Sequence, residues 1–250
     1  MGSDYCLGIG VGGSNGVATA HHGYINGNFT TTAVDIGLSL ATLGHDPSSI
    51  VVYDVKIWDC ISCVRVGPIS DVDVVLENMT LHKNEGGFAT PVVYIDQAIT
   101  MRNVVMTGVA NQLCVTTGVN YQPGVFVNCA AQDGTITSEL GGGTDCIENI
   151  VPADEFQSLD DTNSKFLFLI EGTKAAFADY NPSHGPKPLD VQFGASVEYS
   201  PAESVLAQGG TEPTYAGDED IAGTPRPNED GTYAIGCHEQ IYNPLYSRDQ

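Results

Sequence analysis

A short segment centred on an Asp or Asn residue recurs five times in this chain, and this recurrence limits the possible folds more than any other feature. The central residues are Asp54, Asn78, Asn103, Asn128 and Asn149, so successive copies lie 24, 25, 25 and 21 residues apart. A repeat of this length is typical of solenoids, in which each repeat packs against its neighbours and the chain builds one continuous core.

Apolar residues change phase at each of these Asp or Asn residues. Before Asp54 they alternate with period two, as in Ile50 and Val52, and after it the inward positions shift by one, as in Val55 and Ile57. Period-two alternation is the pattern of a half-buried strand. Because Asn and Asp tolerate the left-handed backbone conformation, each marks a one-residue bend between two strands. We expect their side chains to stack from repeat to repeat as an internal hydrogen-bonded ladder.

The rest of each period has room for a further short strand. The candidates are residues 63–66, 92–95, 113–116 and 134–137. Leucine-rich repeats are the rival solenoid, but Leu is scarce here and no segment with helical periodicity separates the strands. The sequence therefore predicts an all-β fold, a right-handed parallel β-helix with coils of 21–25 residues and an irregular C-terminal cap.

The repeat divides the chain into three parts. Residues 1–49 are expected to form irregular N-terminal coils and a loop, residues 50–152 the regular coils, and residues 153–250 the C-terminal strands, cap and tail. Within the first part, residues 35–43 fit either a short helix or a lateral loop.

The C-terminal part ends in an Asp-x-x-Gly-x-x-Arg run followed by a strand-like segment. The residues of these two motifs are Asp220, Gly223, Arg226, Ile235, Gly236 and Glu239. This ending resembles that of bacterial and phage β-helix proteins of the choice-of-anchor Q class, with Cys237-His238 in place of their usual Ala-Tyr. The resemblance covers about residues 50–239. It implies a β-helix on a cell surface or virion, with this ending capping the open end of the solenoid.

The net charge limits the macromolecules that this chain can bind, and the cysteine spacing bears on whether it holds a metal ion. Nine basic against 31 acidic residues give a formal charge of -22, which repels nucleic-acid phosphates and anionic lipid headgroups. No run of about 18 apolar residues is present to span a membrane, so we expect neither a nucleic-acid partner nor membrane insertion. Cys60 and Cys63 have CxxC spacing without a second such pair, which favours a structural role over a metal site.

Candidate catalytic residues lie in the outward-facing column just before the bends. Glu77 and Arg102 are expected to be neighbours on adjacent coils, about 4.8 Å apart. Asp71, Asp73 and Lys83 lie nearby and complete a set that a polysaccharide lyase could use, with carboxylates holding Ca²⁺ and a basic residue abstracting a proton. A surface ion pair accounts for Glu77 and Arg102 more simply, because no dense carboxylate cluster recurs across the coils.

The sequence thus favours a structural or adhesive protein, extracellular or on a virion, that forms a homo-oligomer or part of a larger assembly such as a filament. Exposed aromatic side chains, for which Tyr53, Tyr94 and Tyr121 are the candidates, would contact glycans. No cofactor is expected for such a protein. The alternative is a polysaccharide lyase or glycoside hydrolase that acts on an acidic polysaccharide near Glu77 and Arg102, with Ca²⁺ as its expected cofactor.

Overall fold

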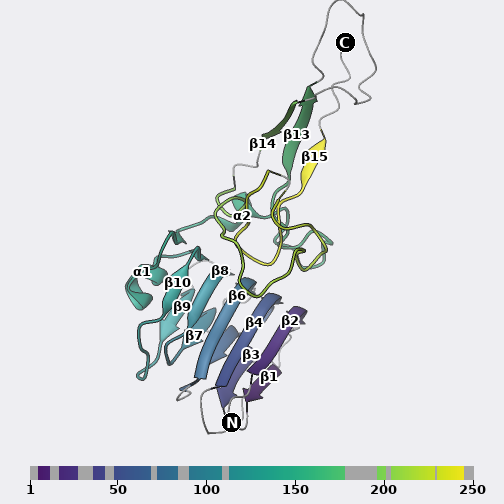
Figure 1. Cartoon of the computed structure of the whole chain (residues 1–250). Coiled ribbons are helices and arrows are strands. Elements are labelled where there is room, and N and C mark those ends of the chain that lie inside the picture. The colour runs from purple at the N-terminus through teal and green to yellow at the C-terminus, as the bar shows by residue number, and fades with distance from the viewer. Residues whose placement is uncertain are drawn as a thin grey trace, which may run out of the picture.

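The structure, a computed structural model, describes residues 5–11, 17–27, 36–42, 48–68, 72–83, 90–108, 113–177, 196–200, 204–228 and 230–244. This part of the chain is mostly β, and its main feature is a pair of parallel sheets (Figure 1). The predicted predominance of parallel strands is therefore confirmed. None of the described helices is long and apolar enough to cross a membrane.

Consecutive strands from β1 to β9 alternate between the two sheets. The small sheet contains, in order, β1 (Tyr5–Val11), β3 (Ile36–Thr42), β5 (Ser62–Val66), β7 (Val93–Ile95) and β9 (Val115–Thr117). The large sheet contains β2 (Val17–Asn26), β4 (Ser48–Trp58), β6 (Val72–Lys83), β8 (Thr100–Gly108), β10 (Val125–Val127), β11 (Ala130–Ala131) and β12 (Ile147–Glu148). The sequence of residues 35–43 fits either a short helix or a lateral loop, but the structure has strand β3 there instead.

The main core is formed by inward-facing side chains of both sheets. From the large sheet it contains the residues that the sequence pattern placed inward on either side of each bend, including Val52, Val55, Leu76 and Met79. From the small sheet it contains residues such as Leu38, which is fully buried. Each such buried side chain contributes about 1.5–3 kcal/mol relative to an exposed one, so the core supplies the main driving force for stacking the strands.

Six residues with positive φ form a column across the large sheet, which we call the bend column. They are His22, Asp54, Asn78, Asn103, Asn128 and Asp145, and their φ angles lie between 49° and 52°. The strand register places each of them opposite the next. Since Asn, Asp and His are the non-Gly residues most often found with positive φ, the residue types explain why the strands bend here.

The last member of the bend column is Asp145 and not Asn149, the residue that the repeat predicts at this place. Val127 pairs with Thr144 and Ala130 with Ile147, so the final step is 17 residues instead of 21. Asn149 has a positive φ of 60° but lies beyond β12. The prediction of Asn149 is wrong because it requires the Ile147 side chain to face inward. Ile147 instead packs against a second core on the outward face of the large sheet.

The segment 134–137, predicted as a strand, begins helix α1 (Thr135–Leu140). The Asp133 carboxylate accepts the backbone N–H and the hydroxyl of Thr135, and Gly141, with φ of 80°, ends the helix. Asp133 and Thr135 also accept the N–H groups of Cys114 and Val115 at 2.8 and 3.0 Å. These side chains therefore satisfy backbone donors at the edge of the small sheet, which would otherwise be open to pairing with another strand.

The C-terminal third adds helix α2 (Pro152–Glu155) and a three-stranded sheet of β13 (Gly172–Phe177), β14 (Ser196–Ser200) and β15 (Tyr242–Pro244). Figure 1 shows this sheet projecting away from the two parallel sheets. We call residues 204–240 the covering segment, and its described residues, 204–228 and 230–240, are irregular with many turns.

The covering segment packs on the outward face of the large sheet, and this corrects the expectation that it would cap the open end. A second core joins Val105 and Ala130 of the sheet to residues of the C-terminal third, which are Phe156, Phe166, Leu167, Leu169, Leu206, Ala234 and Ile235. The physical reason is that the outward face carries apolar side chains at these positions, and they are buried only if another layer covers them.

Candidate functional site

The covering segment is attached to the large sheet along the bend column. The Asn103 side chain donates to Asn78 Oδ1 at 2.9 Å and to the Thr211 carbonyl at 2.7 Å, and it accepts the Thr211 N–H at 3.0 Å. Asn128 donates to the Gly209 carbonyl at 2.6 Å. The expected ladder therefore includes one bond between neighbouring Asn side chains, but these residues also bind the covering segment and do not form a purely internal ladder.

Glu77 is a further attachment point for the covering segment. Its carboxylate is fully buried, and it accepts the backbone N–H groups of Thr214, Tyr215 and Ala216 at 2.7–3.2 Å. Arg102 Nη1 adds an ion pair at 3.0 Å and also bonds the Thr214 hydroxyl. Glu77 faces outward, as the sequence predicted, but the covering segment occupies its hydrogen-bonding capacity.

The other candidate catalytic residues do not converge on Glu77 and Arg102. Asp73 lies on the same strand as Glu77 but is exposed. Lys83 is fully buried, donates to the backbone carbonyl and hydroxyl of Thr90 at 2.7 and 3.0 Å, and has a pKa lowered by burial. Asp71 lies outside the described residues. Within the described part of the chain, the predicted set is therefore reduced to one covered ion pair.

The three candidate glycan-contacting tyrosines lie apart from one another. Tyr53 is on the large sheet and stacks on His21, with ring centroids 4.9 Å apart. Tyr94 is on the small sheet, with the Arg65 guanidinium 5.3 Å from its ring centroid. Tyr121 follows β9, is half-buried, and packs against the main core. They do not form one shared surface.

A buried cluster of charges holds the middle of the covering segment, and we call it the Arg226 clamp. Arg226 forms two hydrogen bonds with the Asp54 carboxylate, at 2.6 and 3.1 Å, and one with Glu239 at 2.8 Å. All three side chains are at most 2% exposed. Bidentate Arg–carboxylate pairs are among the strongest hydrogen-bonded pairs in proteins. The clamp joins the C-terminal motif residues directly to the bend column.

Asp220, Cys237 and His238 lie beside the clamp in an order that could serve nucleophilic catalysis, with a thiol, an imidazole and a carboxylate. Burial lowers the pKa of His238, but Cys237 and Asp220 outweigh this effect and raise the pKa to about 9. The Phe168 ring stacks on His238 at 4.1 Å, and all three titratable side chains belong to residues at most 2% exposed. This group is closed to a substrate, so its position indicates a structural role.

Glu239 should make stability depend on pH. Burial raises its pKa to about 7, against the lowering effect of Arg226. The folded state thus binds this proton more tightly than the unfolded state, and the resulting stabilisation is present at low pH and lost as the pH rises through 7. We expect Glu239 to lower the free energy of unfolding by about 2 kcal/mol between about pH 5 and about pH 8.

Denaturant unfolding of the wild type and of Glu239→Gln at both pH values isolates this contribution, because the glutamine does not titrate. Other carboxylates titrate in both proteins and cancel in the difference. Parallel pH profiles for the two proteins would contradict the assignment.

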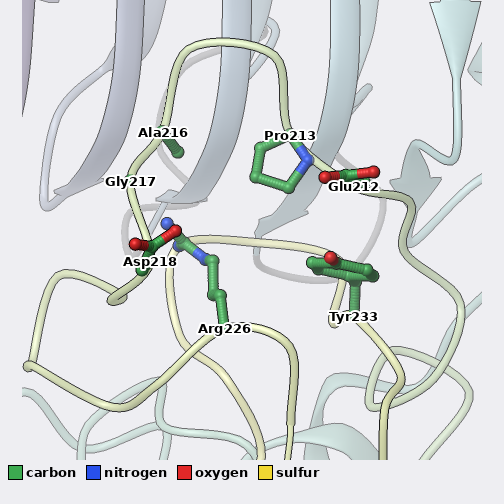
Figure 2. Close-up of a pocket in the computed structure, with 7 residues that line it drawn as sticks. All are labelled: Glu212, Pro213, Ala216, Gly217, Asp218, Arg226 and Tyr233. Carbon is green, nitrogen blue, oxygen red and sulfur yellow. The ribbon is translucent and has the colours of Figure 1, made fainter.

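A small open pocket lies on the outer side of the clamp (Figure 2). It is lined by Glu212, Pro213, Ala216, Gly217, Asp218, Arg226 and Tyr233. Figure 2 shows Arg226 extending toward Asp218, with Tyr233 on the other side of the pocket near Glu212. Glu212 and Asp218 are exposed and Tyr233 is partly exposed, so a small ligand could reach all three.

The lining groups set the chemistry of this pocket. Burial and the carboxylates of Glu212 and Glu239 raise the pKa of Tyr233, which keeps its hydroxyl protonated at neutral pH. Two carboxylates that accept hydrogen bonds, a hydroxyl and an aromatic ring are suited to a neutral polyol or sugar. Among the described residues, no group of three His, Cys, Asp or Glu side chains is placed to hold a metal ion. The pocket could not be predicted from periodicity, because apolar residues do not alternate regularly in the covering segment.

Comparison with known proteins gives no relative for this chain: it matches no family model, no curated protein and no solved structure.

Proposed function

We propose that this chain is a structural and adhesive protein built on a right-handed parallel β-helix, displayed on a cell surface or virion, and that it binds neutral glycans through the pocket at Tyr233. The alternation of consecutive strands between two parallel sheets supports the β-helix. The joining of Asp54, Arg226 and Glu239 in one buried cluster supports a structural role for the C-terminal motif residues.

The covering segment hides the Glu77 carboxylate from solvent, and this observation favours a non-catalytic function. A catalytic carboxylate must come within hydrogen-bonding reach of the substrate. Glu77 is fully buried and accepts three backbone N–H groups and a guanidinium N–H, so access would require removal of residues 214–216. A carboxylate used in this way stabilises the rigid scaffold that a displayed protein needs.

The charge around the pocket favours neutral sugars as ligands. Glu212 and Asp218 lie at its rim, and Asp54 and Glu239 already balance the positive charge of Arg226. Together with the formal charge of -22, these groups repel uronate polymers. The same repulsion counts against a lyase for acidic polysaccharides.

Tyr233→Ala tests the pocket. We expect it to weaken binding of neutral oligosaccharides about fivefold, because the aromatic contact contributes about 0.5–1.5 kcal/mol. A glycan array identifies the ligand, and calorimetry on the full chain measures the affinity. Tyr215→Ala is the matched control, since Tyr215 is exposed, lies in the same segment and does not line the pocket.

Equal losses in Tyr233→Ala and Tyr215→Ala, or no binding of any neutral glycan by the wild type, would reject the pocket as the site. Turnover of an acidic polysaccharide that Arg102→Ala abolishes would support the enzyme instead. Recovery of the native protein within a particle at fixed stoichiometry would support the displayed, assembled state.

A further inference from the structure

Cys129 and Cys146 lie opposite each other at the end of the large sheet. Each directly follows a member of the bend column, Asn128 or Asp145, and the neighbouring pairs Val127–Thr144 and Ala130–Ile147 place the two cysteines in register. The Cys129 backbone N–H donates to Cys146 Sγ at 3.4 Å. In-register residues on adjacent strands are about 4.8 Å apart, which is within the Cα separation that a disulfide spans.

The two thiols differ in exposure and acidity. Cys129 is 1% exposed, and burial raises the pKa of its thiol. Cys146 is half-buried, and a hydrogen bond from Cys129 lowers the pKa of its thiol to about 7, against the raising effects of burial and of Glu148 and Asp145. A partly exposed thiol with a large thiolate fraction is the one that attacks, and a buried neighbour is suited to resolve the product.

We propose that Cys129 and Cys146 form a redox-active pair that closes into a disulfide by exchange with a small-molecule disulfide such as oxidised glutathione. The Cys146 thiolate attacks one sulfur of that disulfide, its S–S bond breaks, and one thiolate leaves. The Cys129 thiol then loses its proton to water and attacks Cys146 Sγ, releasing the second thiolate. The two cysteines lose two electrons in total, and the small disulfide becomes two thiols.

The position of the pair gives this bond a structural effect. β11 and β12 each contain two residues, Ala130–Ala131 and Ile147–Glu148, so the last strand pairs with the large sheet over a short length. A disulfide between Cys129 and Cys146 adds a covalent link at this short pairing. It closes a loop of 17 residues, which restricts the unfolded chain.

Cys60 and Cys63 supply a comparison within the same protein. Both are fully buried, and their thiols donate to the separate carbonyls of Trp58 and Ile57 at 3.3 and 3.7 Å. Burial raises the pKa of Cys63 well above its ordinary value. Despite their CxxC spacing, we expect these thiols to stay reduced under conditions that oxidise the pair at the end of the sheet.

The test uses the full chain equilibrated at neutral pH with reduced and oxidised glutathione in varied ratio. After acid quenching, the remaining thiols are blocked with N-ethylmaleimide, and peptides are mapped by mass spectrometry. We expect a cross-linked peptide joining Cys129 to Cys146 that dithiothreitol removes, while Cys60 and Cys63 are recovered as blocked thiols. The oxidised protein should also unfold at a higher denaturant concentration than the reduced protein.

Two variants separate the steps of the exchange. Cys129→Ser lacks the resolving thiol, so Cys146 should accumulate as a mixed disulfide with glutathione. Cys146→Ser changes a half-buried residue and should leave Cys129 unmodified. If Cys129→Ser does not fold, the initial rates of alkylation of the wild-type cysteines provide the test instead. We expect Cys146 to react at least about tenfold faster than Cys60. Recovery of both wild-type thiols as blocked cysteines in oxidised glutathione, or equal alkylation of Cys146 and Cys60, would overturn the proposal.

Discussion

Replacement of Arg226 by methionine is expected to lower the free energy of unfolding by about 3–5 kcal/mol, the cost of removing one partner from a buried ion pair. The variant leaves the carboxylates of Asp54 and Glu239 buried without their cation, at sites where both side chains are at most 2% exposed. Methionine retains most of the side-chain volume, so the effect reports charge and hydrogen bonding more than packing. Denaturant unfolding of both proteins measures the difference.

Arg65→Met is the matched control for this change. Arg65 is exposed and lies over the Tyr94 ring at 5.3 Å, so its loss should cost about 1 kcal/mol or less. Adding Asp54→Asn to Arg226→Met should restore part of the lost stability, because one uncompensated buried charge is then removed. Equal effects of Arg226→Met and Arg65→Met would show that the clamp does not hold the covering segment.

Glu77→Ala should lower the free energy of unfolding by about 3–4 kcal/mol and loosen the covering segment. The change leaves Arg102 and three backbone N–H groups of residues 214–216 without their acceptor, and each unsatisfied buried donor costs about 1–3 kcal/mol. The estimate lies near the cost of a single buried pair because Arg102 is 24% exposed at its side chain and can be hydrated. Unfolding curves and limited proteolysis within residues 204–240 measure the two effects.

Asp73→Asn is the control for Glu77→Ala, because Asp73 is an exposed carboxylate on the same strand. It should change stability by no more than about 0.5 kcal/mol. If Glu77→Ala left stability and proteolysis unchanged but abolished action on a polysaccharide, the carboxylate would be catalytic and the structural assignment would fail.

The strands of the regular part of the chain could be predicted from the sequence, because their pattern depends only on residues that are close together along the chain. Inward and outward side chains alternate along a strand, and a residue with positive φ shifts that alternation by one, so Asp54, Asn78, Asn103 and Asn128 could be located from their neighbours alone. His22 was missed because it is not Asn or Asp. Helix α1 was missed because its N-cap residue, Gly134, has no side chain that would mark a helix start in the sequence.

The contacts of the site could not be predicted from the sequence, because they join residues that are far apart along the chain. Glu77 meets residue Thr214, 137 positions away, and Asp54 meets Arg226, 172 positions away. One local signal was available: Val105 and Ala130 are apolar although they face outward. Apolar residues on a supposedly solvated face indicate that another layer covers it, and the C-terminal third was the part of the chain left to supply that layer.

The attachment of the covering segment also sets an order for biosynthesis. The ribosome releases Asp54 and Glu77 long before Arg226 and residues 214–216, which satisfy them in the finished protein. Until those residues emerge, the nascent sheets expose anionic side chains without partners and an apolar face without cover. The growing chain therefore reaches its final stability late in translation, and a prematurely terminated product would present an adhesive surface to other unfinished chains.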